Sequence, residues 1–351
     1  MTNIHLDAAA RFDDAGDHDE AVNVLARGTR AGDLTAMTTL GKRLLVGDRA
    51  PYLPKDGAGM VLEAARKGQP EAMAQVAVFQ CTGVFQPKDW PQAFKTLTWA
   101  ARLGWQPARM QLLLFSGRKS EAEQTLGREE AFWQQLGESL DVTALLTVPA
   151  VEPLNFAPVV NAFRSFLTAD FCATLIAQSA RRLKPALVYD PVNKQDIRSV
   201  TRTNSIAQFN LVENEVMHFL LQERISRAAG VPMVQLEATA ILHYQPGEEI
   251  SNHYDFVSPD LPDYDQEISE NGQRIITFLI YLNHEYEGGE TFFPSMGLAF
   301  KGNTGDAMYF VNALEDGSPD LRTLHAGRPP TAGEKWIVSQ FIRNRPVKYV
   351  L

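Results

Sequence analysis

The stretch "QPGEEISNHYDFVSPD" (residues 245–260) places His253 and Asp255 two positions apart, shortly after a Pro-Gly turn. Side chains two residues apart on a β-strand point to the same face of a sheet, so these two could bind one metal ion. A His-x-Asp pair is common, however, and by itself more often marks the place where a strand meets a loop. Whether this pair is a metal site depends on what the rest of the chain supplies.

The best candidate for a third ligand is His325, in "LRTLHAGRPPTAGEKW" (321–336), at the end of a strand-like segment. His218 lies in a predicted helix, where a structural histidine is the commoner role. The other histidines fall in the N-terminal half, out of phase on a strand, or in a loop: His5, His18, His243 and His284. Two imidazoles and one carboxylate form the facial triad that binds non-haem Fe(II) and leaves coordination positions open. A structural zinc site would need a fourth Cys or His, and none is evident.

Lys335 follows His325 by ten residues, across a turn rich in Gly and Pro. On the returning strand its ammonium could reach the same site and bind a carboxylate held at a distance from the metal. The alternative is a solvated surface lysine, which is the usual role of a single lysine.

The C-terminal half is predicted to be rich in strands. Two helical segments, at 166–183 and 214–230, precede the strand-like runs "QLEATAILHY" (235–244), "RIITFLIYLN" (274–283), "DAMYFVNAL" (306–314) and "KWIVSQFIR" (335–343). Loops rich in Gly, Pro, Asp and Asn separate these runs, which is typical of an antiparallel sandwich or barrel. The pattern predicts a jelly-roll braced by helices on one side.

The N-terminal half contains an internal repeat. "AARKGQPEAM" (64–73) recurs as "AARLGWQPARM" (100–110), and two sets of small residues keep a spacing of 36: Gly32, Gly68 and Gly104, and Ala36, Ala72 and Ala108. Stacked helix pairs with small residues at fixed positions bury a continuous core. The segment resembles an array of Sel1-like repeats, relatives of the tetratricopeptide repeat, and an ordinary helical bundle is the alternative. A proline-containing stretch then predicts a domain boundary, with a repeat domain at 1–147 and a second domain at 148–351.

Composition excludes several classes of function. The chain has 351 residues, of which 45% are hydrophobic, and a net charge of -9. This acidic balance argues against nucleic acid as a partner, and no apolar run is long enough to span a membrane. The first residues lack the pattern of a secretory signal. Two cysteines, Cys81 and Cys172, suit a reducing compartment, so we expect a cytoplasmic protein.

Residues 150–345 resemble the prolyl 4-hydroxylase branch of the Fe(II)- and 2-oxoglutarate-dependent dioxygenases. The segments that match are "TRTNS" (201–205), "YQPGEEISNHYD" (244–255), "RIITFLIYLN" (274–283), "GGETFFP" (288–294), "KGNTGDAMYFVN" (301–312) and "LHAGRPPTAGEKW" (324–336). The resemblance implies that the jelly-roll is a double-stranded β-helix, and that His253, Asp255 and His325 bind iron.

The resemblance also implies roles for residues around the metal. Lys335 would pair with the distal carboxylate of 2-oxoglutarate, helped by Thr291, and Tyr244 matches a tyrosine that hydrogen-bonds this cosubstrate. Tyr281 aligns with a position that helps in some members. The resemblance further implies that Arg274 and Arg343 face the substrate, because they match positions that face the peptide in peptidyl-proline hydroxylases. Family members often carry a tyrosine where this chain has Ile250.

The sequence therefore predicts a dioxygenase that uses Fe(II), 2-oxoglutarate and O2, with ascorbate as a candidate reductant, and releases succinate and CO2. Its predicted substrate is a side chain of a protein or peptide, with proline as the leading interpretation, and the repeats would help to bind that partner. The acidic segment 256–273, which has no Lys or Arg, would favour a basic protein segment. Two alternatives stay open: a hydroxylase of a free amino acid or other small molecule, and a binding scaffold with an inactive dioxygenase domain.

Overall fold

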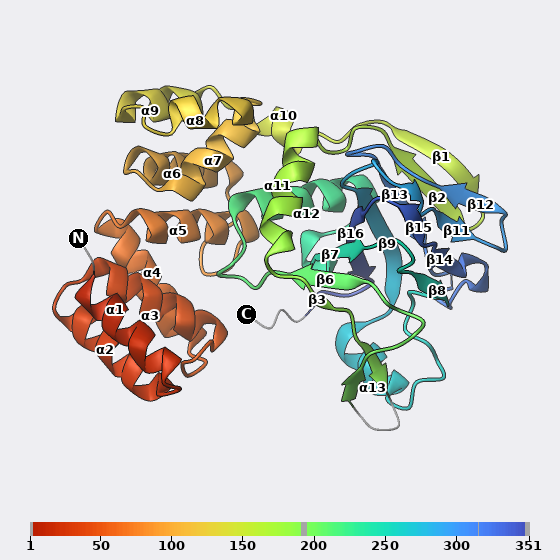
Figure 1. The fold of residues 1–351 in the computed structure, drawn as a ribbon, viewed down its shortest axis with the longest axis horizontal. Helices are drawn as coiled ribbons and strands as arrows, with labels where there is room; N and C mark the ends of the chain where they lie inside the picture. The colour runs from red at the N-terminus through yellow and green to blue at the C-terminus, as the bar shows by residue number, and fades with distance from the viewer. Residues whose placement is uncertain (1–2, 191–194, 315, 348–351) are drawn as a thin grey trace. The chain divides into compact units, whose positions relative to one another are not determined.

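The structure is a computed structural model that describes residues 3–190, 195–314 and 316–347. It divides into two units (Figure 1). The first, which is helical, comprises the residues up to Thr147 together with Phe209–Leu221. The second consists of the described residues of Val148–Gln208 and Gln222–Tyr349, and antiparallel sheets dominate it. A helical N-terminal region followed by an antiparallel-sheet domain, the coarse fold expected from the sequence, is thereby confirmed.

The N-terminal region folds as a succession of helices joined by short turns. Their bounds are α1 (Ile4–Asp14), α2 (His18–Arg30), α3 (Leu34–Val46), α4 (Pro54–Arg66), α5 (Pro70–Thr82), α6 (Trp90–Arg102), α7 (Gln106–Phe115), η1 (Lys119–Glu121), α8 (Ala122–Thr125), α9 (Glu130–Glu138) and α10 (Val142–Leu146). Within the described residues, no helix is long and apolar enough to cross a membrane.

The spacing of 36 residues seen in the sequence recurs in the conformation. Gly32, Gly68 and Gly104 each follow the end of a helix and have φ angles of 86°, 91° and 93°. This left-handed region is costly for other residues, and glycine therefore ends each of these helices. The alanines at the same spacing, Ala36, Ala72 and Ala108, have no exposed surface. Equivalent small residues thus occupy equivalent positions in successive helix pairs.

Two further glycines let α3 and α4 approach each other closely. A Cβ atom added to Gly57 would lie 2.5 Å from the carbonyl oxygen of Gly41 and 2.8 Å from the amide nitrogen of Leu45. Both neighbours are backbone atoms of α3, so they cannot move aside as a flexible side chain would. Gly59, on the same helix, has nothing within 4 Å of such an atom.

This difference predicts opposite effects of one substitution at two positions of α4. Gly57→Ala forces the two helices apart and should lower the free energy of unfolding by about 1–3 kcal/mol. Gly59→Ala meets no neighbour and reduces the backbone entropy that the chain loses when it folds. It should therefore raise the free energy of unfolding by about 0.5–1 kcal/mol. Urea denaturation followed by circular dichroism measures both. Equal effects of the two substitutions would contradict the close approach of α3 and α4.

The second unit contains two larger sheets. One has the strand order β1-β2-β13-β9-β16-β7-β6-β3, and the other β12-β11-β14-β8, while β10 pairs with β15 and β4 with β5. The strands are β1 (Val151–Phe156), β2 (Val159–Phe163), β3 (Lys184–Pro185), β4 (Val188–Asp190), β5 (Gln195–Ile197), β6 (Ser205–Gln208), β7 (Ala240–Tyr244), β8 (Ile250–His253), β9 (Arg274–Tyr281), β10 (Glu287–Gly288), β11 (Thr291–Phe293), β12 (Leu298–Phe300), β13 (Ala307–Val311), β14 (His325–Gly327), β15 (Pro330–Ala332) and β16 (Lys335–Arg343).

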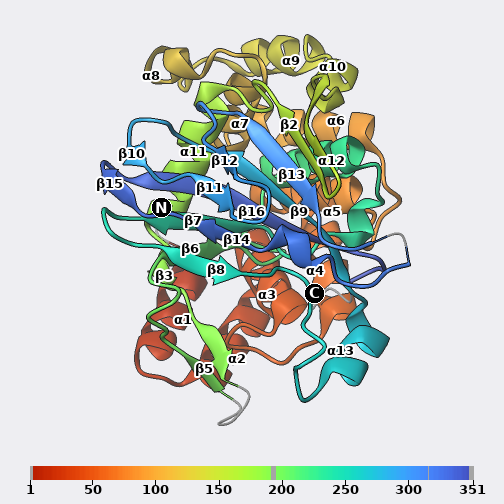
Figure 2. The same cartoon turned by 90° about the vertical axis from the view of Figure 1, so that its right-hand side faces the viewer.

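The two sheets lie face to face and share one hydrophobic core (Figure 2). Phe310 and Ile337 from the larger sheet pack with Phe293 and Phe300 from the smaller one. All the pairings within these sheets are antiparallel. The strands that the sequence indicated at 235–244, 274–283, 306–314 and 335–343 become β7, β9, β13 and β16.

The predicted helices are also present, as α11 (Ala169–Ala180) and α12 (Val216–Ala229), and α13 (Tyr264–Asn271) lies between β8 and β9. Gln222 of α12 donates a hydrogen bond to the Thr239 hydroxyl, which in turn donates to Gln340 of β16. The C-terminal part of α12 is therefore tied to the larger sheet.

Candidate active site

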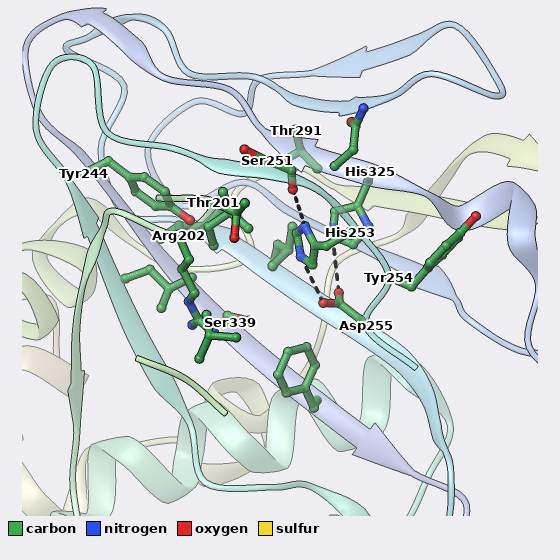
Figure 3. Close-up of a pocket in the computed structure, with 18 of the residues that line it drawn as sticks. Thr201, Arg202, Tyr244, Ser251, His253, Tyr254, Asp255, Thr291, His325 and Ser339 are labelled. Carbon is green, nitrogen blue, oxygen red and sulfur yellow. Dashed lines mark hydrogen bonds and ion pairs between the residues drawn. The ribbon is translucent and has the colours of Figure 1, made fainter. Parts of the chain in front are cut away.

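The pairing of β8 with β14 brings the three predicted metal ligands together. His325 lies opposite His253 in this pairing, and Asp255 follows His253 by two residues in the chain. The Nε2 atoms of the two histidines each lie 3.3 Å from an oxygen of the Asp255 carboxylate. The three ligand atoms are within 4.8 Å of one another. Figure 3 shows these side chains converging in a cavity of about 390 Å³.

The hydrogen bonds of the two imidazoles fit a metal ligand. Nδ1 of His253 lies 2.9 Å from the carbonyl oxygen of Ser251, and Nδ1 of His325 lies 3.0 Å from that of Thr323. A carbonyl oxygen only accepts hydrogen bonds, so both Nδ1 atoms carry a proton, and the Nε2 atoms that face Asp255 are the ones available to bind a metal. This orientation and tautomer are those of metal-binding histidines. Two imidazoles and one carboxylate, with the rest of the coordination sphere open to a cavity, fit Fe(II).

Asp255 is buried and is oriented by a chain of hydrogen bonds. The Thr277 hydroxyl donates to Oδ2 of Asp255 at 2.8 Å, and the Asn312 amide donates to the Thr277 oxygen at 2.9 Å. The amide nitrogen can only donate, so the Thr277 proton has to point at the carboxylate. Burial opposes ionisation of Asp255, but the neighbouring His325 and His253 outweigh it and hold its pKa well below its usual range. Asp255 is therefore an ionised carboxylate with a fixed orientation.

Lys335 lies in the same cavity and has 1% of its surface exposed. It lies opposite Tyr244 in the pairing of β16 with β7, and its Nζ is 4.8 Å from the centre of the Tyr244 ring. Burial lowers the pKa of Lys335 to about 8, an effect that the charge of Glu290 partly opposes. No carboxylate among the described residues forms an ion pair with it. Because a buried, unpaired ammonium is costly, this position favours an anionic ligand.

Of the three other residues expected around the cosubstrate, two line the cavity and the third lies outside it. Tyr244 and Thr291 line the cavity with Lys335. The Tyr281 hydroxyl lies 2.8 Å from the Thr291 hydroxyl and donates to the carbonyl oxygen of Phe300. Tyr281 is buried behind Thr291 and is absent from the residues that line the cavity. It is thus placed to orient Thr291.

The two arginines expected to face the substrate form ion pairs with one carboxylate. Arg274 donates to both oxygens of Glu237, at 2.7 and 2.9 Å, and still lines the cavity. Arg343, opposite Arg274 in the pairing of β16 with β9, donates to Glu237 at 2.6 Å and to the carbonyl oxygen of Gly272 at 2.6 Å. Its remaining nitrogen pairs with Glu267 at 2.8 Å, and Arg343 does not line the cavity.

Sequence reasoning did not single out several residues of the site. Thr277 and Asn312 orient Asp255, Glu237 holds the two arginines, and Arg202 lines the cavity beside Tyr244 and His253 (Figure 3). Arg202 lies in "TRTNS" (201–205), one of the segments that match the family, and this match could have indicated that Arg202 belongs to the site. The other three are ordinary polar residues on strands or at their ends, and only the strand pairing shows what they contact.

The chain is similar in sequence to known oxygenases over part of its length. Residues 239–343 match the family model of the 2OG-Fe(II) oxygenase superfamily. "Probable prolyl 4-hydroxylase 9" of Arabidopsis thaliana is 31% identical over 209 residues, which cover 55% of this chain and 71% of that protein. "Prolyl 4-hydroxylase 13" of the same plant is 30% identical over 225 residues, 59% of this chain and 79% of that one. The structure of a viral collagen prolyl hydroxylase from Paramecium bursaria Chlorella virus-1 aligns with a TM-score of 0.40 and 24% identity, over 52% of this chain and 94% of its own.

The fold and the site thus define a 2-oxoglutarate-dependent dioxygenase, whose superfamily uses Fe(II), 2-oxoglutarate and O2. The chain belongs to the prolyl 4-hydroxylase family. This membership confirms the resemblance noted in the sequence.

The hydrogen bond from Thr277 to Asp255 predicts a loss of metal affinity when the hydroxyl is removed. Thr277→Val keeps the shape of the side chain but leaves one carboxylate oxygen unrestrained, and it should weaken metal binding by about 10–100-fold. Thr277→Ser retains the hydroxyl and should bind metal nearly as wild type does. Anaerobic calorimetry with Mn(II), well below the unfolding temperature of each metal-free variant, measures this. Equal affinities of the Val variant and wild type would show that Thr277 does not orient Asp255.

Proposed function

We propose that this protein hydroxylates a prolyl side chain in a protein or peptide, consuming 2-oxoglutarate and O2 and releasing succinate and CO2. The observation that carries the proposal is that the His253–Asp255–His325 cluster and the unpaired, buried Lys335 share one cavity. One part of the cavity fits a metal and the other fits a carboxylate. Membership of the prolyl 4-hydroxylase family supports proline as the target.

Six residues that line the cavity would bind the metal and the cosubstrate. His253, Asp255 and His325 would bind Fe(II), which together with 2-oxoglutarate and O2 supplies the oxidation of an unactivated C–H bond. Lys335 and Thr291 would bind the distal carboxylate of 2-oxoglutarate and so direct its other end toward the metal ligands. The Tyr244 hydroxyl would add a hydrogen bond to the same molecule.

Other groups would position the substrate and exclude water. Leu242, Leu279 and Ile337 line the cavity and keep it apolar away from the charged groups. Arg274 lines it too, with its Nε and one terminal nitrogen engaged by Glu237. Its other terminal nitrogen would donate to a backbone carbonyl of the substrate. Arg343 would act through Glu237, by holding that carboxylate against Arg274.

We infer that residues 148–351 form the oxygenase domain, with the double-stranded β-helix of its family, and that residues 1–147 form a Sel1-like repeat domain. The recurring glycine turns and buried alanines support the repeat assignment. Cys81 and Cys172 are buried and form no disulfide, in keeping with a reducing compartment such as the cytoplasm.

The helical domain would bind the substrate protein outside the segment that is hydroxylated. A hollow in this domain supports this, because Trp99 is 49% exposed there. It is lined by apolar residues together with Arg66, Gln86 and Thr96. An exposed tryptophan is a common anchor in protein interfaces. A second contact of this kind raises the affinity for an intact partner without changing the active site. An intact substrate protein should therefore have a lower KM than a short peptide with the same proline.

The direct test of the proposed function is hydroxylation of proline-containing peptides by the purified protein with Fe(II), 2-oxoglutarate and O2. Mass spectrometry should find one added oxygen on proline, and His253→Ala, which loses a metal ligand, should abolish the product. Hydroxylation of a free amino acid but of no peptide would support the small-molecule alternative instead. A biological function that survives His253→Ala would support the inactive scaffold.

The lowered pKa of Lys335 predicts how 2-oxoglutarate binding depends on pH. The free protein loses the Lys335 proton above about pH 8, whereas the bound carboxylate needs the charged form. Binding must therefore take up a proton at higher pH, and the apparent Kd should rise about tenfold for each pH unit above that value. Calorimetry with Fe(II) and no O2 measures this.

The matched control for this pH dependence is Lys335→Met. Without an ammonium it should bind 2-oxoglutarate weakly at every pH and lack the additional loss above pH 8. A wild-type Kd that stays constant from pH 7 to pH 10 would contradict the role of Lys335.

A further inference from the structure

Arg202 is held at the edge of the cavity by backbone pairing with β8, the strand that carries His253. The Ser251 amide donates to the carbonyl oxygen of Thr201 at 2.9 Å, and the Thr203 amide donates to that of Glu249 at 3.0 Å. Arg202 itself lies opposite Ile250 in this pairing. Its side chain lines the cavity together with Tyr244 and His253 (Figure 3). The position of this guanidinium is therefore set by the same strand as the metal site.

The guanidinium of Arg202 has no partner within the described part of the chain. Its Nε is buried and has no hydrogen bond, and no carboxylate forms an ion pair with it. Two carboxylates, those of Glu248 and Glu249, directly precede the residue opposite Arg202. Glu248 accepts a hydrogen bond from the Gln245 amide, and Glu249 accepts one from the Ser251 hydroxyl. Its charge nevertheless acts on the cavity: burial raises the pKa of the Tyr244 hydroxyl, and Arg202 opposes that rise.

The other cations in or beside the cavity are balanced either by carboxylates of the protein or, for Lys335, by the proposed cosubstrate. Arg274 is paired with Glu237, and Arg343 behind it is paired with Glu237 and Glu267. In the loaded enzyme, Asp255 and the two carboxylates of 2-oxoglutarate would balance Fe(II) and Lys335. Asp255 is the one carboxylate among the described residues that line the cavity. Arg202 is thus left as the cation for which neither the described residues nor the cosubstrate supply a counter-charge.

We propose that Arg202 binds a carboxylate of the substrate, so that the preferred substrate carries Asp or Glu next to the proline that is hydroxylated. This inference rests on the proposed function. A guanidinium matches a carboxylate with two parallel N–H donors. Ile250, opposite Arg202, has no hydrogen-bonding group that could engage the guanidinium in place of the substrate.

The acidic segment 256–273 suggests the opposite preference, for a basic peptide. However, no residue of this segment lines the cavity, and Glu267 is already paired with Arg343. Arg202 lines the cavity wall and is close enough to Tyr244 to influence its ionisation. The nearer, unpaired charge should dominate the choice of the residue beside the proline, because interactions between exposed charges weaken strongly with distance in salt.

The test uses the full-length protein and three peptides that differ only in the residue beside one proline: Asp, Asn or Lys. Peptide affinity is measured with Fe(II) and 2-oxoglutarate in the absence of O2, and KM is measured with O2. We expect the Asp peptide to bind about 10–100-fold more tightly than the Asn peptide, as for a charge-assisted pair. Arg202→Gln should abolish this difference and leave the affinity for 2-oxoglutarate unchanged. Arg328→Gln removes an equal charge outside the cavity and should behave as wild type.

The possible outcomes separate this inference from the proposed function. The inference is overturned, and the proposed function stands, if the wild-type protein hydroxylates all three peptides and binds them equally tightly, or if it binds the Lys peptide most tightly. It is also overturned if Arg202→Gln weakens 2-oxoglutarate binding, because Arg202 would then serve the cosubstrate. If none of the peptides is bound or hydroxylated while 2-oxoglutarate is still converted to succinate, the proposed function fails and the inference fails with it.

Discussion

The pairing of β8 with β14 is the constraint on which the site depends. It places His325 opposite His253, and a shift of one residue would turn one of the two imidazoles to the other face of the sheet. The neighbouring pairings have equivalent effects: Lys335 lies opposite Tyr244, and Thr291 lies opposite Gly327. The shared core of the two sheets stabilises these registers, because a slip would expose Phe293 or Phe310 to water. The fold therefore fixes the position of Lys335 relative to the cluster of His253, Asp255 and His325.

The cations in and beside this cavity are of two kinds: those paired with a carboxylate of the protein and those without such a partner among the described residues. Glu237 and Glu267 together balance the charges of Arg274 and Arg343, which lie far apart in the sequence. Burying two arginines without those carboxylates would be costly. Lys335 and Arg202, by contrast, have no carboxylate partner among the described residues, although both line the cavity. A protein that leaves cations unpaired in a cavity is suited to anionic ligands, and here two such cations are available.

Much of the fold and of the site could be predicted from the sequence. The strand runs ending at Tyr244, starting at Arg274 and starting at Lys335 appear at the expected places, because alternating and continuous apolar runs between turn residues report directly on strands. His253, Asp255, His325 and Lys335 could be selected because metal and anion chemistry restricts the residue types. The spacing of 36 residues likewise predicted turns that the structure contains.

Other features could not be predicted, because they depend on contacts between distant segments. Nothing near Glu237 in the sequence indicates that it meets Arg274 and Arg343, and nothing near Thr277 indicates that it donates to Asp255. Phe209–Leu221 groups with the N-terminal helices although it lies between segments of the other unit, and a reading along the chain gives no sign of this. These contacts follow from strand order and helix packing, which local patterns do not encode.

The most direct test of the account is an anaerobic titration of the protein with Fe(II) and 2-oxoglutarate, followed by visible absorption. If the cluster of two histidines and Asp255 shares its cavity with a carboxylate site at Lys335, one equivalent of each should bind. A charge-transfer band should then appear when both are present, and not with either alone. His325→Ala, which loses a metal ligand, should show no band. Binding of 2-oxoglutarate that is independent of Fe(II), or a band that survives His325→Ala, would contradict the account.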